Sequence, residues 1–415
     1  LSSVVMDNIN QIKMMPQDVS AKIAAGEVIE NPASVIKELV ENSIDANSKQ
    51  IVVEIVDGGT KFMKVSDDGV GISKNQVGLA FQRFATSKII DWENFDNIAT
   101  LGFRGEALPS ISSVAEVDMM TKTKGEEFGV KFQIKNGVVE NKNAVGLSIG
   151  TSIEVRNLFA ELPVRRKFLK GISTESSRIS VVLNNYALAY PSIKFRFISN
   201  GKQIFATNGS GDLREVVLTL LGLKVAESML EVEPQSIENA SGIKVTGLIG
   251  SAEIHRKTRK NMYVFVNGRW INNRAFSYTL QQAYKGFLPD GVFPVMIINI
   301  SVPFDKVDVN VHPSKKEVRF VAEKDITGLV QKIIRDVLVN RNPVPIINSY
   351  SGGNQKFPVA GFTKKYPSSF GKNTVLSPSD TEFNSTNFFE GDPVFQEEIY
   401  KGSIRKLLPI LRPIG

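Results

Sequence analysis

Residues 31–47 read NPASVIKELVENSIDAN, a stretch that predicts one helix with two different faces. Asn31 is a suitable N-cap, and Pro32 occupies the first helical position, where its missing N–H costs nothing. Apolar residues recur at helical spacing on one face: Val35, Ile36, Leu39, Val40 and Ile44. At about 100° per residue, the opposite face collects Glu38, Glu41, Asn42 and Asp45. Taken alone, such a stripe is typical of a solvent-facing helix surface.

Composition restricts the chemistry that this chain can carry. Its 415 residues suffice for two or three domains, and 42% apolar and 22% charged residues are ordinary for a globular protein. The sequence has no cysteine and only two histidines, His255 and His312, which excludes disulfides, thiolate zinc sites, iron–sulfur clusters and multi-histidine metal sites. A net charge of +7 weakly favours polyanionic partners.

The chain shows no membrane or secretion signal. No apolar run approaches the ~20 residues of a membrane span, and the N-terminus has no basic start followed by an apolar core. We therefore expect no membrane partner and a cytoplasmic protein. The chain opens on Leu1, so we expect residues 1–15 to be an N-terminal extension, with Met6 a plausible true start.

The first half of the chain predicts an α+β layer. Two alternating β-branched runs within residues 51–72 flank Asp57-Gly58-Gly59, a strong hairpin signal. We expect a short helix over 74–85, a glycine-rich turn entering a helix over 101–114, and strands near 116–123, 127–135, 137–143 and 149–156. The result is a mostly antiparallel sheet with helices on one side.

The second half predicts a further α/β unit. A compact basic turn (162–171) precedes a helix over 174–191 that starts at a threonine cap, and a hairpin (195–208) around Asn200-Gly201. Later elements are helices over 212–221, 273–287 and 324–340, with strands near 243–251, 261–267 and 293–301. We place the first domain at 16–208 and the second at 209–342. Residues 343–402 have the composition of a disordered linker, and 403–415 become apolar again.

Two glycine-rich turns provide features that a nucleotide site requires, although a Walker phosphate loop is absent. The Gly69-x-Gly71 turn offers a backbone that a flat ring can approach, and Asp67 offers a carboxylate that can accept from an exocyclic amine. The lid turn (residues 101–108, LGFRGEAL) places an arginine at a helix N-terminus, which suits phosphate. Each feature alone is more often a plain bend or capping loop.

Seven motifs in order resemble the MutL family of mismatch-repair proteins, within the GHKL ATPase superfamily. They are IAAGEVIENPASVIKELVENSIDA (23–46), DDGVGI (67–72), FATSKI (84–89), LGFRGEALPSISSV (101–114), RRKFLK (165–170), VFVNGRW (264–270) and VDVNVHPSKKEVRF (307–320). LGFRGEAL and NVHPSKKEVRF separate this family from gyrases, heat-shock chaperones and histidine kinases. The resemblance implies a GHKL (Bergerat) ATPase sandwich followed by a domain with a ribosomal-protein-S5-like fold.

The resemblance also implies roles by position, with ATP and Mg²⁺ as cofactors. Glu38 resembles the general base, Asn42 the Mg²⁺ ligand, Asp67 the adenine reader, and Lys315 the residue that reaches the γ-phosphate. Further cofactor-binding residues are implied at the adenine turn, in the segment after the short helix and in the lid turn: Gly69, Gly71, Thr151, Thr86, Ser87, Lys88, Gly102, Phe103, Arg104, Gly105, Glu106, Ala107 and Leu108. For Glu41 and Asp45, a tuning role and a structural role both stay open.

Several cations could face DNA. Arg269 resembles a residue of the family's DNA-binding groove. The run beginning at His255 offers sequence-independent phosphate contacts through Arg256, Lys257, Arg259 and Lys260. We expect Arg165, Arg166 and Lys167 to be mainly structural or weakly DNA-facing, and His312 to be structural.

The function implied is that of an ATP-dependent mismatch repair factor. ATP would drive two copies into a DNA clamp, slow hydrolysis would reset it, and the mismatch-recognition protein MutS would be a partner. No endonuclease motif of the DQHA type is present. The rivals are a topoisomerase ATPase subunit, which would need an acidic cluster that Glu390-Gly391-Asp392 does not provide, a histidine kinase, and a DNA-binding scaffold with a dead ATPase.

Overall fold

The computed structural model describes residues 14–88, 100–102, 104–135, 138–233, 242–271, 273–308, 319–320 and 323–341. Several predictions lie outside these residues: the extension before residue 14, the sites at Phe103 and Lys315, the structural role of His312, the linker and the apolar terminus. Among the described helices, none is both long enough and apolar enough to cross a membrane.

Helix α2 (Pro32–Asp45) is the predicted two-faced helix. The side chain of Asn31 caps it by accepting a hydrogen bond from the Ser34 N–H at 3.1 Å, and Pro32 stands in the first turn. The predicted apolar face is core, since Val35, Ile36 and Val40 have no exposed surface. Helix α1 (Gln17–Val28) precedes it.

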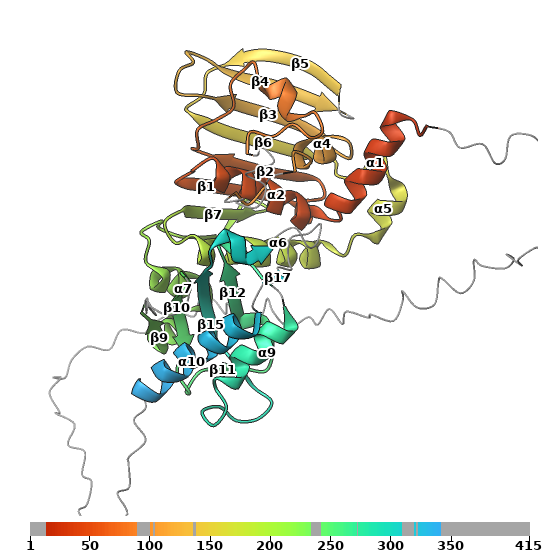
Figure 1. Cartoon of the computed structure of the whole chain (residues 1–415). Coiled ribbons are helices and arrows are strands. Elements are labelled where there is room, and N and C mark those ends of the chain that lie inside the picture. Colours follow the sequence, from red (N-terminus) through yellow and green to blue (C-terminus); the bar gives the residue numbers. More distant parts are fainter. Residues whose placement is uncertain are drawn as a thin grey trace, which may run out of the picture. The chain divides into compact units, whose positions relative to one another are not determined.

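An eight-stranded sheet forms the first domain, in the order β5-β4-β3-β6-β2-β1-β7-β8 (Figure 1). All neighbours are antiparallel except β1 and β7. The strands are β1 (Gln50–Val56), β2 (Phe62–Asp67), β3 (Glu116–Lys122), β4 (Gly129–Lys135), β5 (Val138–Val145), β6 (Gly150–Arg156), β7 (Lys194–Ser199) and β8 (Lys202–Ala206). Both predicted hairpins and all four predicted strands are therefore confirmed.

One face of this sheet is packed and the other is solvated. Along β1, Ile51, Val53 and Ile55 are buried, and α2, α4 (Ala107–Ser112) and α6 (Ile172–Ala189) contact the strands. The opposite face carries ion pairs between strands, such as Lys64–Glu154 at 3.0 Å and Arg156–Asp118 at 2.9 Å. This alternation is what a sheet with helices on one side requires.

Three local predictions differ from the structure. The helix expected over 74–85 is only α3 (Val77–Ala80): Gly78 weakens it, and Phe84 turns to a φ of 64° and donates its N–H to the Gly105 carbonyl. Helix α6 starts at Ile172 with Gly171 as N-cap, not at a threonine cap. The basic turn contains a short helix, α5 (Pro163–Phe168).

The second domain is a five-stranded sheet in the order β13-β12-β15-β10-β9. The strands are β9 (Met229–Val232), β10 (Lys244–Gly250), β12 (Met262–Val266), β13 (Arg269–Trp270) and β15 (Met296–Ser301), with the small pairs β11 (His255–Arg256) with β14 (Phe293–Pro294) and β16 (Val307–Asp308) with β17 (Arg319–Phe320). The helices are α7 (Leu213–Leu221), α8 (Leu223–Glu227), α9 (Arg274–Gln282) and α10 (Glu323–Arg341). Strand β9 and helix α8 were not predicted.

Strand β12 is buried on both faces. Tyr263 and Phe265 belong to the core that continues through α7 into the first domain. Met262, Val264 and Val266 belong to a second core with residues of α9 and α10. Helices thus cover both faces of this sheet, which explains why β12 reads as an unbroken apolar run.

A substitution at Leu39 tests the packing of α2. Replacing Leu39, which is 1% exposed, by alanine should lower the free energy of unfolding by about 2–5 kcal/mol because a cavity remains. The same change at Leu218, a helical leucine that is 44% exposed, should cost less than about 1 kcal/mol. Urea unfolding of both variants measures the difference, and equal losses would contradict the assigned burial.

Candidate functional site

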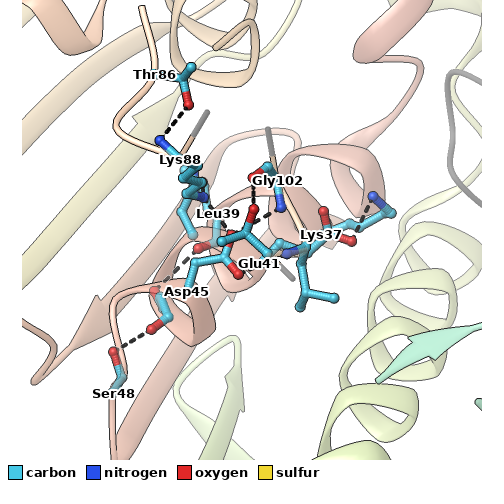
Figure 2. Close-up of polar contacts among 12 residues, drawn as sticks. Lys37, Leu39, Glu41, Asp45, Ser48, Thr86, Lys88 and Gly102 are labelled. Carbon is cyan, nitrogen blue, oxygen red and sulfur yellow. Dashed lines mark hydrogen bonds and ion pairs between the residues drawn. The ribbon is translucent and has the colours of Figure 1, made fainter. Parts of the chain in front are cut away.

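The polar face of α2 is not a solvated surface. It divides into two networks of charged side chains, one around Lys37 and one around Lys88 (Figure 2). Glu41 is only 4% exposed. Carboxylates in such surroundings need partners, because burying an unpaired charge is costly.

The first network joins α2 to α6. Lys37 Nζ lies 2.9 Å from a carboxylate oxygen of Glu38 and 2.9 Å from one of Glu41, and the Tyr186 hydroxyl donates to Glu41 at 2.7 Å. Burial lowers the pKa of Lys37, but Glu38 and Glu41 outweigh it and hold that pKa above its ordinary value. Burial, then Glu41, raise the pKa of Tyr186 well above its ordinary value. The structure therefore favours the structural role for Glu41.

The second network ties the start of the lid turn to α2. The Asp45 carboxylate accepts the N–H groups of Leu101 at 2.9 Å and Gly102 at 3.0 Å, and Lys88 Nζ lies 2.5 Å from it. Lys88 also donates to the amide oxygen of Asn42 at 3.0 Å. Figure 2 labels Lys88, Gly102 and Asp45 among the residues of these contacts. Asp45 is therefore an anchor for the segment 100–102.

The oxygens of Asn42 and Asp45 converge on a cation, the Lys88 ammonium. The described residues contain no cluster of three or more histidine, cysteine or acidic side chains that could hold a metal by themselves. Mg²⁺ commonly takes one or two protein oxygens and completes its shell with phosphate oxygens and water. Asn42, with its hard oxygen already facing a positive charge, fits that pattern.

Asp67 ends strand β2 with its carboxylate in a confined position. One oxygen accepts from the Ser43 hydroxyl at 2.7 Å and the other from the Gly69 N–H at 2.9 Å. Thr151 is its register partner on β6 and contacts the Thr121 hydroxyl at 3.1 Å. Burial raises the pKa of Asp67, and the hydrogen bonds only partly offset it. Sequence reasoning missed Ser43, which carries no motif signal of its own beside Asn42.

Backbone packing accounts for the two glycines beside Asp67. At Gly71, with a φ of 73°, a Cβ would lie 2.1 Å from the Lys122 carbonyl oxygen. At Gly69 it would lie 2.7 Å from the Ala46 Cβ. The chain itself fills the space in that direction, so glycine is required by the fold.

The segment after α3 packs on the lid turn. Besides the bond from Phe84 to Gly105, the Lys88 N–H donates to the Thr86 hydroxyl at 3.1 Å. A Cβ at Gly105 would meet the Ala85 carbonyl oxygen at 2.5 Å. Ser87 is exposed, whereas four predicted lid residues are partly buried, with the last two opening α4: Arg104, Glu106, Ala107 and Leu108.

Arg269, which the family resemblance assigns to a DNA-binding groove, is buried in this structure. Its side chain is only 6% exposed and donates to the Thr100 carbonyl at 2.6 Å. The run predicted beside it does reach the surface: Lys257, Arg259 and Lys260 are exposed, and Arg256 is partly buried. The Arg259 guanidinium lies 5.0 Å from the centre of the Phe293 ring.

Arg165 has a structural position. It donates to the Lys22 carbonyl at 2.9 Å and so joins α5 to α1, whereas Arg166 and Lys167 are exposed. The predicted structural role of Arg165 agrees with these contacts.

Two family models match the chain. One, described as histidine kinase-, DNA gyrase B- and HSP90-like ATPase, matches residues 29–162. The other, described as DNA mismatch repair protein, C-terminal domain, matches residues 217–339. The first match includes α2, Asp67 and the lid turn, and the second includes the five-stranded sheet. The predicted fold class, a GHKL ATPase sandwich followed by an α/β domain, is confirmed.

Curated relatives are DNA mismatch repair proteins named MutL. The protein of Thermoanaerobacter pseudethanolicus is 38% identical over 408 residues, 97% of this chain and 66% of the relative. That of Clostridium beijerinckii is 38% identical over 392 residues, 92% of this chain and 58% of the relative. The chain therefore spans between 58% and 66% of the length of these relatives.

Solved structures agree with this grouping. A crystal structure of the N-terminal domain of a DNA repair protein is 26% identical to this chain, with a TM-score of 0.66. The match covers 78% of this chain and 98% of the solved chain. The Aquifex aeolicus MutL ATPase domain complexed with ADP is 28% identical, with a TM-score of 0.52. That match covers 74% of this chain and 98% of the solved chain.

Asp45→Ala tests the anchor on the lid turn. Without the carboxylate, the amides of Leu101 and Gly102 should exchange with solvent roughly 10- to 150-fold faster, since a hydrogen bond to a charged group contributes about 1.5–3 kcal/mol. Hydrogen exchange resolved to these amides is the measurement. The control is Glu38→Ala on the same helix, which should leave both amides unchanged; equal effects of the two variants would refute the anchor.

Proposed function

This chain belongs to the MutL family of DNA mismatch repair proteins, and we propose that its first domain binds and hydrolyses ATP to control the association of two copies on DNA. The observation that carries the proposal is α2 itself. It presents a carboxylate, Glu38, and a cation-facing amide, Asn42, one turn apart, beside the confined carboxylate of Asp67. A relative of the same fold was solved with ADP.

Glu38 is proposed as the general base. Its side chain is 14% exposed, so it is withdrawn from bulk solvent yet accessible to a water molecule. Lys37 Nζ lies 2.9 Å from one of its carboxylate oxygens and so helps to hold the side chain in place, and a carboxylate can take a proton from that water. Positions i and i+4 of a helix stack on one face, which places this base about one turn from Asn42.

Asn42 is proposed to hold Mg²⁺ through its amide oxygen. When bound, the metal would stabilise the negative charge that develops on the phosphates. The Lys88 ammonium now donates to that oxygen at 3.0 Å, so Lys88 has to exchange this partner for a phosphate when nucleotide and metal enter. Asp45 keeps Lys88 nearby throughout that exchange.

Asp67 is proposed to read adenine. An ionised carboxylate accepts a hydrogen bond from the exocyclic amine, which guanine does not present at that position. The hydrogen bonds from Ser43 and Gly69 fix the orientation of the carboxylate. Thr151, its register partner, is proposed to assist together with the Gly69–Gly71 backbone.

The remaining predicted contacts stay proposals that rest on the family resemblance. Thr86, Ser87 and residues 102–108 would surround the phosphates, and Lys315 would reach the γ-phosphate. The packing of residues 84–88 on Gly105, next to α2, supports the first group.

DNA, MutS and a second copy of this chain are proposed partners. The exposed cations Lys257, Arg259 and Lys260 favour sequence-independent phosphate contacts. The match of residues 217–339 to the mismatch-repair model favours this function over a topoisomerase ATPase subunit or a histidine kinase. Magnesium dependence, a cytoplasmic location and the lack of an endonuclease motif stay predictions.

Glu38→Gln tests the proposed base. It keeps the shape of the side chain but cannot accept a proton, so ATP turnover should fall by about 10²- to 10⁴-fold while ATP affinity is retained. Steady-state hydrolysis and nucleotide binding are the measurements. Glu54→Gln, on the solvated face of the sheet, is the control and should leave turnover unchanged. If Glu38→Gln also leaves turnover unchanged, Glu38 is not the general base.

The raised pKa of Asp67 predicts a pH dependence of nucleotide binding. Protonation removes the negative charge and so weakens the acceptor for the amine. Because burial raises the pKa of Asp67, protonation occurs at a higher pH than for an ordinary aspartate. ATP affinity should therefore fall on acidification while most other carboxylates are still ionised. Asp67→Asn should bind ATP weakly, with no change over that pH range. A wild type with pH-independent affinity there would count against the assignment.

A further inference from the structure

The turn between β12 and β13 joins the second domain to the first, and each residue of Asn267-Gly268-Arg269 has a separate contact. Asn267 pairs with its own domain: its amide donates to the Val302 carbonyl and accepts the Val302 N–H, both at 2.9 Å. Asn267 and Gly268 have φ values of 48° and 77°, as a tight two-residue hairpin requires. The turn is therefore fixed to the second domain.

Gly268 lets the first domain approach the turn closely. The Tyr190 hydroxyl, at the end of α6, donates to the Gly268 carbonyl at 3.2 Å. A Cβ at Gly268 would lie 2.3 Å from that hydroxyl oxygen, so a larger residue would displace the Tyr190 side chain and break this contact.

Arg269 reaches from this turn to the segment that Asp45 holds. Its Nη2 donates to the Thr100 carbonyl at 2.6 Å, and Nη1 is buried with no hydrogen-bond partner among the described residues. The next two residues, Leu101 and Gly102, give their N–H groups to Asp45. Burial raises the pKa of Tyr190, Asp45 adds to this and Arg269 opposes it, which fits one compact cluster of the three side chains.

A buried guanidinium with an unused donor is a poor structural choice by itself. If Arg269 only filled space in the core, its buried N–H group without a hydrogen-bond partner would lower the stability of the fold, and an apolar residue would avoid this cost. The Arg269 guanidinium instead lies against the Thr100 carbonyl, directly before the two residues whose N–H groups bind Asp45. Residues 100–102 are therefore held by Asp45 of α2 in the first domain and by Arg269 of β13 in the second.

We propose that Arg269 is a positioning residue that transmits the state of the second domain to the lid turn by holding the Thr100 carbonyl. This inference rests on the proposed ATPase function and deepens it. A shift of the second domain moves Arg269, which moves residues 100–102 relative to Asp45 and so changes the surroundings of Lys88 and Asn42. The second domain thereby adjusts hydrolysis without contacting nucleotide through this residue.

The test compares Arg269→Ala, Arg269→Lys and Lys257→Ala in the full chain. Three quantities are measured: exchange of the Leu101 and Gly102 amides, kcat and KM for ATP, and retention on a DNA duplex at low salt. Residues that couple two sites change the coupling by about 2- to 30-fold. Arg269→Ala should speed the exchange and lower kcat within that range, with a smaller change in KM. Arg269→Lys, which keeps a cationic donor group, should show a smaller change in both quantities.

The controls separate the possible outcomes. Lys257→Ala, which removes an exposed cation of the same domain, should weaken DNA retention and leave the two amides unchanged. Tyr190→Phe keeps the packing and removes the second contact of the turn, so it should speed the same exchange even if Arg269→Ala does not fold.

Two results would overturn the proposal. One is unchanged exchange and kcat in both Arg269→Ala and Tyr190→Phe. The other is loss of DNA retention in Arg269→Ala with these quantities unchanged, which would make Arg269 a DNA contact only. A wild type without ATP hydrolysis would refute the proposed function, whereas faster exchange in Arg269→Ala would still support the contact.

Discussion

The buried polar face of α2 is the constraint on which the rest of the site depends. A helix packed on a sheet along one side and on α6 along the other leaves its carboxylates little water, so each must find a partner within the protein. Glu41 finds Tyr186 and Lys37, and Asp45 finds Lys88 and two backbone N–H groups. These pairings fix α6 and the lid turn around the one helix that also carries Glu38 and Asn42.

Neighbouring polar side chains of α2 differ in the kind of partner that they bind. The side chains of Glu41 and Asp45 also accept hydrogen bonds from a tyrosine hydroxyl and from backbone N–H groups, respectively. The contacts of the Glu38 and Asn42 side chains are with the Lys37 and Lys88 ammonium groups. A lysine paired to a catalytic group is easier to displace than a backbone bond, because its long side chain can move while the helix stays in place. The two residues proposed for chemistry are thus those whose partners can change.

Much of the fold was predictable because it depends on local patterns. The cap at Asn31, the hairpin at Asp57-Gly58-Gly59 and the alternating strands each have a short-range physical cause, and the structure agrees with them. The failures depend on long-range contacts. The helix after Asp67 is cut short by a bond to the lid turn, and the parallel pairing of β1 with β7 joins segments that are far apart in sequence.

The site shows the same division. The motifs named Glu38, Asn42 and Asp67, but no pattern in the sequence could show that Asp45 anchors the lid turn or that Ser43 orients Asp67. Arg269 is the clearest case: its motif resembles one that carries a DNA-groove residue in the family, and only the tertiary structure shows this side chain buried against Thr100. Burial depends on what packs on a residue, which a local pattern does not contain.

We propose that the polar face of α2 and the lid turn form one nucleotide site. Hydrogen exchange of the wild-type chain, with and without Mg²⁺ and a non-hydrolysable ATP analogue, tests this most directly. We predict that the analogue changes the protection of α2, of residues 84–88 and of Leu101 and Gly102, and leaves the exposed edge strand β5 unchanged. Protection that changes only outside α2 and the lid turn, or not at all at saturating analogue, would contradict it.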